Sequence, residues 1–197
     1  MKHNHGKPTA AGKSSFDLID VEAFFRELDL RPGVTLLDLA CGRGAYSLKA
    51  AEIVGAAGTV YAVDLWQEGI EHLKVRAAEE NALNIKAILG DAGRRIPVDD
   101  QLVDVCLMAT VLHDFVEDQI AKEVLQEVAR VLKANGLLAI VEFKKIDGPP
   151  GPPVHIRLSR EAVGDMLIPY GITEIRCVDI GPYNYLTLYN KTDSGDA

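Results

Sequence analysis

The sequence predicts an α/β protein whose centre is a doubly wound, mostly parallel β-sheet that ends in an antiparallel strand. Apolar segments of strand length alternate with segments of helical periodicity along most of the chain, which is typical of repeated strand–helix units. Leu102–Ala109 is almost wholly apolar, as expected of a central parallel strand covered on both faces. The last two apolar segments are joined by Ile180-Gly181-Pro182, which is too short for a crossover helix, so this pair is expected to be antiparallel.

The first half of the chain is divided by glycine and proline. A helix is expected over Asp17–Leu30, where apolar side chains recur at helical spacing until Arg31-Pro32-Gly33 interrupts them. Glycine turns separate the elements that follow. In chain order these are a strand over Val34–Leu39, a helix over Ala45–Val54, a strand over Thr59–Asp64, a helix over Gln67–Asn81 and a strand over Ile85–Leu89.

The second half continues the alternation after the apolar strand. A helix is expected over Asp118–Lys133, with Asn135-Gly136 as its C-terminal cap. The proline-rich segment 148–153 is incompatible with a helix or an inner strand. The remaining expected elements are a fifth strand over Leu137–Phe143, a helix over Ser159–Pro169 and strands over Glu174–Asp179 and Tyr183–Tyr189.

Length and composition bound the class of protein. The 197 residues fit one domain with a substantial core, and we expect it over residues 16–191, between a mobile tail over 1–15 and a short tail over 192–197. The formal net charge of −8 argues against strong nucleic-acid binding, which needs clustered Lys and Arg. No apolar run reaches membrane-spanning length and the polar start lacks the apolar core of a signal peptide, so we expect a cytoplasmic protein.

The three cysteines predict neither a disulfide framework nor a metal site. Cys41, Cys106 and Cys177 lie far apart in the sequence and form no CxxC pair. Cys106 lies inside the apolar strand and is expected in the core. No spacing of carboxylates and amides indicates a magnesium-dependent mechanism either, so no metal is predicted.

Two carboxylates flank a glycine loop at the expected strand ends. Asp38 lies in the first strand, just before the turn Gly42-Arg43-Gly44, and Asp64 ends the second strand. The carboxyl ends of neighbouring parallel strands meet at one edge of the sheet, where ligands of such folds bind. Together the two carboxylates favour a ligand with a cationic end and a ribose, which describes S-adenosylmethionine better than a dinucleotide.

A nicotinamide dinucleotide is the main alternative ligand. Its G-x-G-x-x-G fingerprint has a third glycine where this chain has Ser47. A pyrophosphate at the helix N-terminus would also be opposed by Asp38, four residues before Gly42, whereas an ammonium would be favoured. These residues therefore argue against an oxidoreductase.

Each carboxylate has a hypothetical role toward S-adenosylmethionine. Asp38 would face the methionine end, Asp64 would accept hydrogen bonds from the ribose hydroxyls, and Asp91 would accept one from the adenine amino group beside Ala92. A plainer reading stays open for Asp38 and Asp64, in which both cap the strand ends by binding loop amides.

In these motifs the chain resembles the class I S-adenosylmethionine-dependent methyltransferases, of the small ubiquinone-biosynthesis-like, type 11 kind. The resemblance extends from about Phe16 to Lys191 through LDLACGRG, VYAVD, LGDA, VDVCLMATVLHDF and VARVLKANGLLAIVEF. It implies a Rossmann-like, seven-stranded sheet in the order 3-2-1-4-5-7-6, with the reversed seventh strand between the fifth and the sixth. The cofactor-binding residues expected on this basis are Asp38, Ala40, Cys41, Gly42, Gly44, Asp64, Leu65, Gly90, Asp91, Ala92 and Ala109.

Two positions depart from the family pattern. Ala40 stands where relatives often have glycine, and Arg43 stands where a small polar residue is common. Arg43 would either contact the cofactor carboxylate or point to solvent.

Two groups of residues are candidates on the acceptor side. His113 and Asp114 follow the fourth strand, and His113 would act as a general base for a hydroxyl or amine acceptor or would simply line the pocket. The second group flanks the proline-rich segment and would either bind an anionic substrate or form a solvated rim: Lys144, Lys145, His155 and Arg157.

The function predicted from the sequence is methyl transfer from S-adenosylmethionine to a small-molecule acceptor, with S-adenosylhomocysteine as product. The alternatives are a non-catalytic S-adenosylmethionine-binding sensor or partner module and an NAD-dependent oxidoreductase. The sequence does not identify the acceptor or the oligomeric state.

Overall fold

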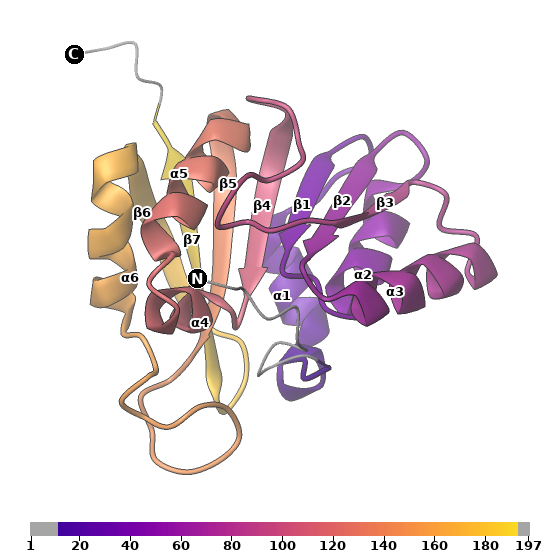
Figure 1. Ribbon diagram of the computed structural model, residues 1–197. Coiled ribbons are helices and arrows are strands. Elements are labelled where there is room, and N and C mark those ends of the chain that lie inside the picture. Colours follow the sequence, from indigo (N-terminus) through magenta and orange to yellow (C-terminus); the bar gives the residue numbers. More distant parts are fainter. Residues whose placement is uncertain (1–11, 193–197) are drawn as a thin grey trace.

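Seven strands form one sheet in the order β3-β2-β1-β4-β5-β7-β6, in a computed structural model that describes residues 12–192 (Figure 1). All neighbouring strands are parallel except β7, which runs antiparallel to both β5 and β6. The strands are β1 (Thr35–Leu39), β2 (Thr59–Asp64), β3 (Ile85–Leu89), β4 (Val103–Ala109), β5 (Leu132–Phe143), β6 (Ile172–Asp179) and β7 (Asn184–Lys191). The predicted fold class, strand order and final antiparallel pair are confirmed.

Helices cover both faces of the sheet. On one face lie α1 (Val21–Leu28), α2 (Ala45–Val54) and α3 (Gln67–Glu79). On the other lie α4 (Leu112–Glu117), α5 (Ala121–Val131) and α6 (Arg160–Leu167). Two short 3₁₀ helices, η1 (Phe16–Leu18) and η2 (Ile168–Tyr170), complete the structure.

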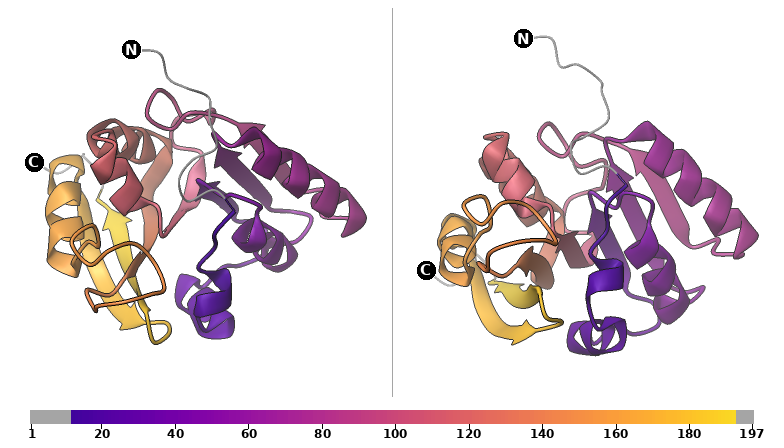
Figure 2. Two further views of the ribbon diagram at one scale, coloured as in Figure 1. Left: turned by 60° about the horizontal axis from the view of Figure 1, so that its bottom comes forward. Right: turned by 90° about the horizontal axis from the view of Figure 1, so that it is seen from below.

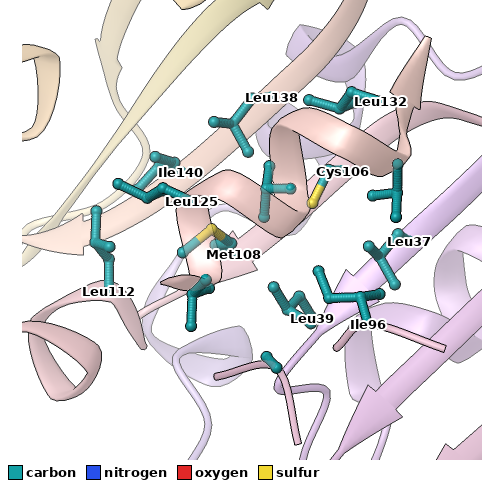
Figure 3. Close-up of a cluster of buried hydrophobic side chains, with 14 of the residues drawn as sticks. Leu37, Leu39, Ile96, Cys106, Met108, Leu112, Leu125, Leu132, Leu138 and Ile140 are labelled. Atoms are coloured by element: carbon teal, nitrogen blue, oxygen red, sulfur yellow. The ribbon is translucent and has the colours of Figure 1, made fainter. Parts of the chain in front are cut away.

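Two apolar layers hold these helices against the sheet. In the layer of Figure 3, Met108 of β4 and Ile140 of β5 lie near Leu112 and Leu125 of the covering helices. Cys106 is fully buried in the same layer, as predicted. Each side chain that leaves water in this way contributes about 1.5–3 kcal/mol to folding, so the sheet is a rigid base for the loops at its edges.

The first predicted helix is shorter than expected. The segment Asp17–Leu30 divides into η1 and α1, because Asp20 interrupts it as an N-cap whose carboxylate accepts a 2.9 Å hydrogen bond from the N–H of Ala23. The helix then ends at Leu28, since Asp29 adopts a left-handed conformation with φ of 46°. The helix is therefore shorter than predicted at both ends, because Asp20 caps its start and the left-handed Asp29 ends it.

The region after β4 also differs from the prediction. An additional helix, α4, directly follows the strand, and α5 begins at Ala121 instead of Asp118. Asn135-Gly136 does not cap a helix, because β5 begins at Leu132, immediately after α5. The residues between Leu132 and Leu137 form an irregularity in the pairing with β4, and the φ of 59° at Asn135 belongs to this irregularity.

The other boundaries agree with the prediction to within about two residues, apart from the end of the predicted helix Ser159–Pro169, which is divided between α6 and η2. The predicted terminal tails lie outside the described residues, apart from 12–15 and 192. Within the described part of the chain, no helix is long and apolar enough to cross a membrane.

Candidate cofactor site

Two adjoining cavities lie where β1, β2, β3 and β4 end. Figure 2 turns this edge of the sheet toward the viewer. The first cavity has a volume of about 140 Å³ and the second of about 290 Å³. They share Ala40, Gly42 and Ala109 as wall residues, so together they form one elongated site of the size usual for small-molecule ligands.

Asp64 ties the end of β2 to the loop after β1. One carboxylate oxygen accepts a hydrogen bond from the N–H of Gly42 and the other accepts one from the N–H of Trp66, both at 2.7 Å. Burial raises the pKa of Asp64, against the lowering effect of these amides. Asp64 thus does cap loop amides, and its carboxylate also lines the first cavity.

Asp38 is the most deeply buried carboxylate of the site, with only 2% of its surface exposed. It accepts a 2.5 Å hydrogen bond from the hydroxyl of Ser47 at the start of α2. Burial raises the pKa of Asp38 to about 7, although the hydrogen bond from Ser47 lowers it. Asp38 lines the second cavity, so the two predicted carboxylates lie in the two halves of the site.

The loop between β1 and α2 has three residues with positive φ, namely Ala40 at 60°, Gly42 at 57° and Gly44 at 76°. A side chain on Gly44 would meet Leu73, since an added Cβ would lie 2.3 Å from Leu73 Cδ1. Gly44 lines neither cavity, so its role is to let α2 pack against α3. Glycine adopts the left-handed conformation of position 40 without strain, whereas Ala40 is strained in it.

The expected adenine side forms the far wall of the first cavity. Gly90, Asp91 and Ala92 line it together with Leu65, half of whose surface is exposed. Asp91 caps its own loop by accepting a 3.0 Å hydrogen bond from the N–H of Gly93. Of the predicted cofactor residues, Cys41 lines the second cavity, and all except Gly44 line one or both.

Gly12, Lys13 and Trp66 are wall residues that were not predicted from the sequence. Trp66 lines the first cavity, and the guanidinium of Arg43 lies 5.6 Å from the centre of its ring. Gly12 and Lys13 line both cavities. The tryptophan directly after the predicted Asp64-Leu65 pair was the available signal, whereas nothing in the polar N-terminal sequence indicated proximity to the site.

His113 lies behind the cavity wall. Its Nδ1 is 2.7 Å from a carboxylate oxygen of fully buried Glu142, and its backbone N–H donates to the other oxygen at 3.2 Å. Burial lowers the pKa of His113, but the hydrogen bond and negative charge of Glu142 outweigh burial, so the pKa is raised overall. The partner Glu142 was not identified from the sequence.

Asp114, unlike His113, lies on the wall of the first cavity. Its carboxylate lies 3.6 Å from Nε2 of His113. Burial raises the pKa of Asp114, while His113 lowers it. Glu142, His113 and Asp114 therefore form a chain of titratable groups that leads from the interior to the cavity.

Two members of the predicted basic group, Arg157 and Lys144, bind groups of the protein itself, whereas Lys145 and His155 are exposed. Arg157 is 1% exposed, and its five N–H groups donate to the carbonyl oxygens of Lys144, Ile146, Gly148, Pro150 and Pro152 at 2.6–2.9 Å. The Lys144 ammonium is also occupied, by Asp179 and by the carbonyl of Gly181. A guanidinium can bind backbone carbonyls as well as anions, and the sequence alone does not show which of the two an arginine binds.

No group of three or more His, Cys, Asp or Glu side chains within residues 12–192 is arranged to hold a metal ion. The three cysteines are free thiols, and burial raises the pKa of Cys41 well above its ordinary value. Cys41 is therefore a protonated wall residue.

Comparison with known proteins identifies the family. A family model described as a methyltransferase domain matches residues 36–136. Nocamycin O-methyltransferase of Saccharothrix syringae is 32% identical over 148 residues, which cover 70% of this chain and 48% of that protein. Demethylmenaquinone methyltransferase of Lactobacillus johnsonii is 31% identical over 127 residues, covering 64% of this chain and 50% of that protein. The chain thus spans about half the length of these curated relatives.

A solved structure agrees over a longer range. The S-adenosylmethionine-dependent methyltransferase of Aquifex aeolicus has a TM-score of 0.82 and 30% identity, over 91% of this chain and 94% of that chain. The chain belongs to the family of S-adenosylmethionine-dependent methyltransferases, as its motifs predicted.

Proposed function

We propose that this protein transfers a methyl group from S-adenosylmethionine to a small organic acceptor. The observation that carries the proposal is the distribution of carboxylates along the elongated site. Asp38 lies in one cavity, Asp64 and Asp91 lie in the other, and the glycine loop joins them. This spacing of acceptors fits a ligand with an ammonium, a ribose and an adenine amino group in that order.

The buried carboxylate of Asp38 shows whether the site suits S-adenosylmethionine. A carboxylate that is almost wholly buried and is bonded only by the hydroxyl and the backbone of one serine, Ser47, is costly unless a cation joins it. The methionine ammonium would supply that charge next to Asp38, and the ribose hydroxyls would reach the oxygens of Asp64 that already organise the loop. The residues present therefore suit the cofactor of the family.

Alignment and exclusion of water are the chain's contributions to methyl transfer. When bound, S-adenosylmethionine supplies an electrophilic methyl carbon on a sulfonium. Asp64, through its bond to Gly42, fixes the loop on one side of the junction between the cavities. Ala109 fixes the wall on the other side, at the end of β4. Holding the reacting groups in line in a dry site supplies much of the rate enhancement expected for a displacement reaction.

We assign the proton-handling role to the pair Asp114 and His113. Asp114 lies on the cavity wall, where an acceptor hydroxyl or amine would meet it, and His113 stands behind it with Nε2 at 3.6 Å. Glu142 holds the opposite side of the imidazole, so the edge that bears Nε2 is directed toward Asp114. A base of this kind is required only for an acceptor that must lose a proton.

The relatives support a small organic acceptor. The names of these relatives refer to nocamycin and to demethylmenaquinone. The free thiols suit the cytoplasm, where we place the protein.

The first experiment is calorimetric titration with S-adenosylmethionine, S-adenosylhomocysteine and NADH in parallel. Micromolar affinity for the first two ligands and none for NADH is expected. Binding of NADH alone would contradict the proposal and favour an oxidoreductase. An Asp64→Ala variant should lose affinity for S-adenosylhomocysteine by at least about tenfold, since both a ribose acceptor and a loop anchor are removed. Asp147→Ala, at an exposed carboxylate of the proline-rich loop, is the matched control.

Turnover separates the enzyme from a sensor. Release of S-adenosylhomocysteine in the presence of phenols, quinols, amines or thiols would support transfer and identify the acceptor atom. Tight cofactor binding without release for any of these classes would favour the sensor.

A further inference from the structure

The segment of residues 12–18, called the strap below, runs over both cavities. Gly12 and Lys13 line both of them, and Ser14, Ser15 and Asp17 line the second. A Cβ built on Gly12 would lie 3.5 Å from the indole of Trp66, so the strap lies directly against the wall of the first cavity. A ligand that extends through both cavities therefore lies beneath the strap.

One hydroxyl joins the strap to both sides of the site. Ser15 is 2% exposed, and its Oγ lies 2.9 Å from the hydroxyl of Tyr46 on α2. The same oxygen accepts a 3.3 Å hydrogen bond from the hydroxyl of Thr110, which follows β4. Because Tyr46 lines the second cavity and Thr110 the first, this hydroxyl chain bridges the junction between them.

Backbone strain at Thr110 supports a functional role for this chain. Thr110 has a φ of 53°, which is an outlier for a β-branched residue and is therefore strained. The conformation is held by its N–H, which donates a 2.8 Å hydrogen bond to the carbonyl of Val141. Strain of this kind persists where the surrounding structure fixes it, and here it directs a hydroxyl toward the strap.

The two ends of the strap are held differently. At its far end, Phe16 packs edge-on against Tyr46 at 5.0 Å, and shortly after it the N–H of Asp20 donates a 2.7 Å hydrogen bond to Ile180. At the end over the cavities, Ser14 bonds only within the strap, and the side-chain hydrogen bonds that join residues 12–15 to the rest of the described chain are those of Ser15. Hydrogen bonds between neutral hydroxyls contribute little net stability, so this end is held weakly enough to open.

We propose that the strap is a gate for the cofactor, and that the hydroxyl of Ser15 is its latch to Tyr46 and Thr110. The strap opens about its held end near Phe16 to admit or release the cofactor, and it closes over the bound cofactor in between. The identity of the ligand rests on the proposed function, whereas the latch rests on the contacts of Ser15. A latch that closes the free and the occupied site alike slows uptake and release together, which distinguishes it from a residue that merely contacts the ligand.

Trp66 makes the gate measurable. It is the only tryptophan of the chain and lines the first cavity, so its fluorescence should report the binding of S-adenosylhomocysteine in a stopped-flow instrument. Ser15→Ala and Tyr46→Phe should each raise both the association and the dissociation rate constants by about 5–20-fold and change Kd by less than about threefold. Tyr61→Phe, which removes a hydroxyl paired with Lys86 on β3, is the matched control and should leave both rates unchanged.

Hydrogen exchange of the free protein tests the latch without any ligand. The amides of Ser15 and Leu18 should exchange faster in Ser15→Ala and Tyr46→Phe, while those of α2 should keep the rates of the unmodified protein, which also shows that the variants fold. Unchanged exchange and unchanged binding rates in both variants would overturn the gate. So would a rise in dissociation alone with an equal rise in Kd, since that pattern marks a simple ligand contact. Failure of the unmodified protein to bind S-adenosylhomocysteine would instead contradict the proposed function and remove the cofactor role of the strap with it.

Discussion

Ser47, at the start of α2, donates a 2.5 Å hydrogen bond to the carboxylate of Asp38, which is buried near the end of β1. The bond joins the strand to the helix across the glycine loop. Asp38 nevertheless has a pKa of about 7, because burial raises it and the hydroxyl and backbone of Ser47 offset only part of that effect. A site that requires the ionised carboxylate must therefore supply the missing positive charge from its ligand.

The stability of the ligand-free protein should fall as the pH rises from about 4 to about 7 because of Asp38. Its pKa is higher in the folded than in the unfolded protein, so the folded state binds more protons across this range. Ionisation should cost on the order of 4 kcal/mol at pH 8 relative to pH 4. The measurement is urea unfolding at both pH values for the unmodified protein and for Asp38→Asn, in which this loss should be absent.

An Asp99→Asn variant, at an exposed carboxylate, is the control and should follow the unmodified protein. If Asp38→Asn loses as much stability between the two pH values as the unmodified protein, the ionisation of Asp38 is not the cause.

Ala40→Gly should stabilise the protein. Ala40 has a φ of 60°, which costs an L-residue about 1–2 kcal/mol, whereas glycine adopts this conformation freely. The greater freedom of glycine in the unfolded chain offsets part of the gain, so we expect a net increase of about 0.5–1 kcal/mol in the free energy of unfolding. Ala78→Gly on the exposed face of α3 should lower it by a similar amount. Equal losses in both variants would show that position 40 is unstrained.

Glu142→Gln should lower the pKa of His113 below its ordinary value. Burial alone lowers this pKa, and Glu142 is the main group that raises it. In the unmodified protein, the raised pKa contributes stability that is fully present below pH 6.5 and is lost as the pH rises through the folded-state pKa. The stability difference between the two proteins should therefore shrink between pH 6 and pH 9.

Titration of the imidazole signals by NMR checks this prediction directly. Glu117→Gln, on the exposed side of α4, should leave the titration of His113 unchanged. A variant at Glu142 that titrates as the unmodified protein does would argue that the 2.7 Å contact has no electrostatic effect.

Arg157→Lys should destabilise the proline-rich loop although it keeps the charge. A lysine has three donors on one nitrogen and cannot reach all five carbonyls that Arg157 satisfies. Leaving two or more buried carbonyls unpaired should cost about 2–4 kcal/mol in urea unfolding. Arg160→Lys, at an exposed ion pair with Glu174, should cost less than about 1 kcal/mol. Similar losses in the two variants would show that the carbonyl contacts contribute little.

The sequence predicted best the parts of the fold that glycine and apolar length define. The bounds of β2, β3 and α2 agree with the prediction to the residue, because Gly44, Gly55, Gly58 and Gly90 mark the ends of compact apolar segments. The predictions failed where tertiary contacts decide, as at β5, which continues directly from α5 because Leu132 pairs with Val103 of β4.

The same division holds for the site. Residues that act through their own strand end, such as Asp38 and Asp64, could be identified from spacing, and both lie on the cavities. Glu142 could not, since it meets His113 from a strand 29 residues away and no local pattern links them. Ser15 was missed and the role of Arg157 was predicted wrongly for a related reason, because their partners are hydroxyls and backbone carbonyls that leave no signature in the sequence.

In the loop around Arg157, the groups that fix the backbone conformation differ from the side chains that are exposed to solvent. Alternate carbonyls, from Lys144 to Pro152, turn inward to one guanidinium, and Gly151 must stay small because an added Cβ would lie 2.7 Å from Phe143. The side chains of Lys145, Asp147 and Pro153 are exposed and take no part in these contacts. These three side chains can therefore be substituted while the backbone of the loop keeps its conformation. Natural variation or directed evolution can change the surface chemistry of this loop without changing its structure.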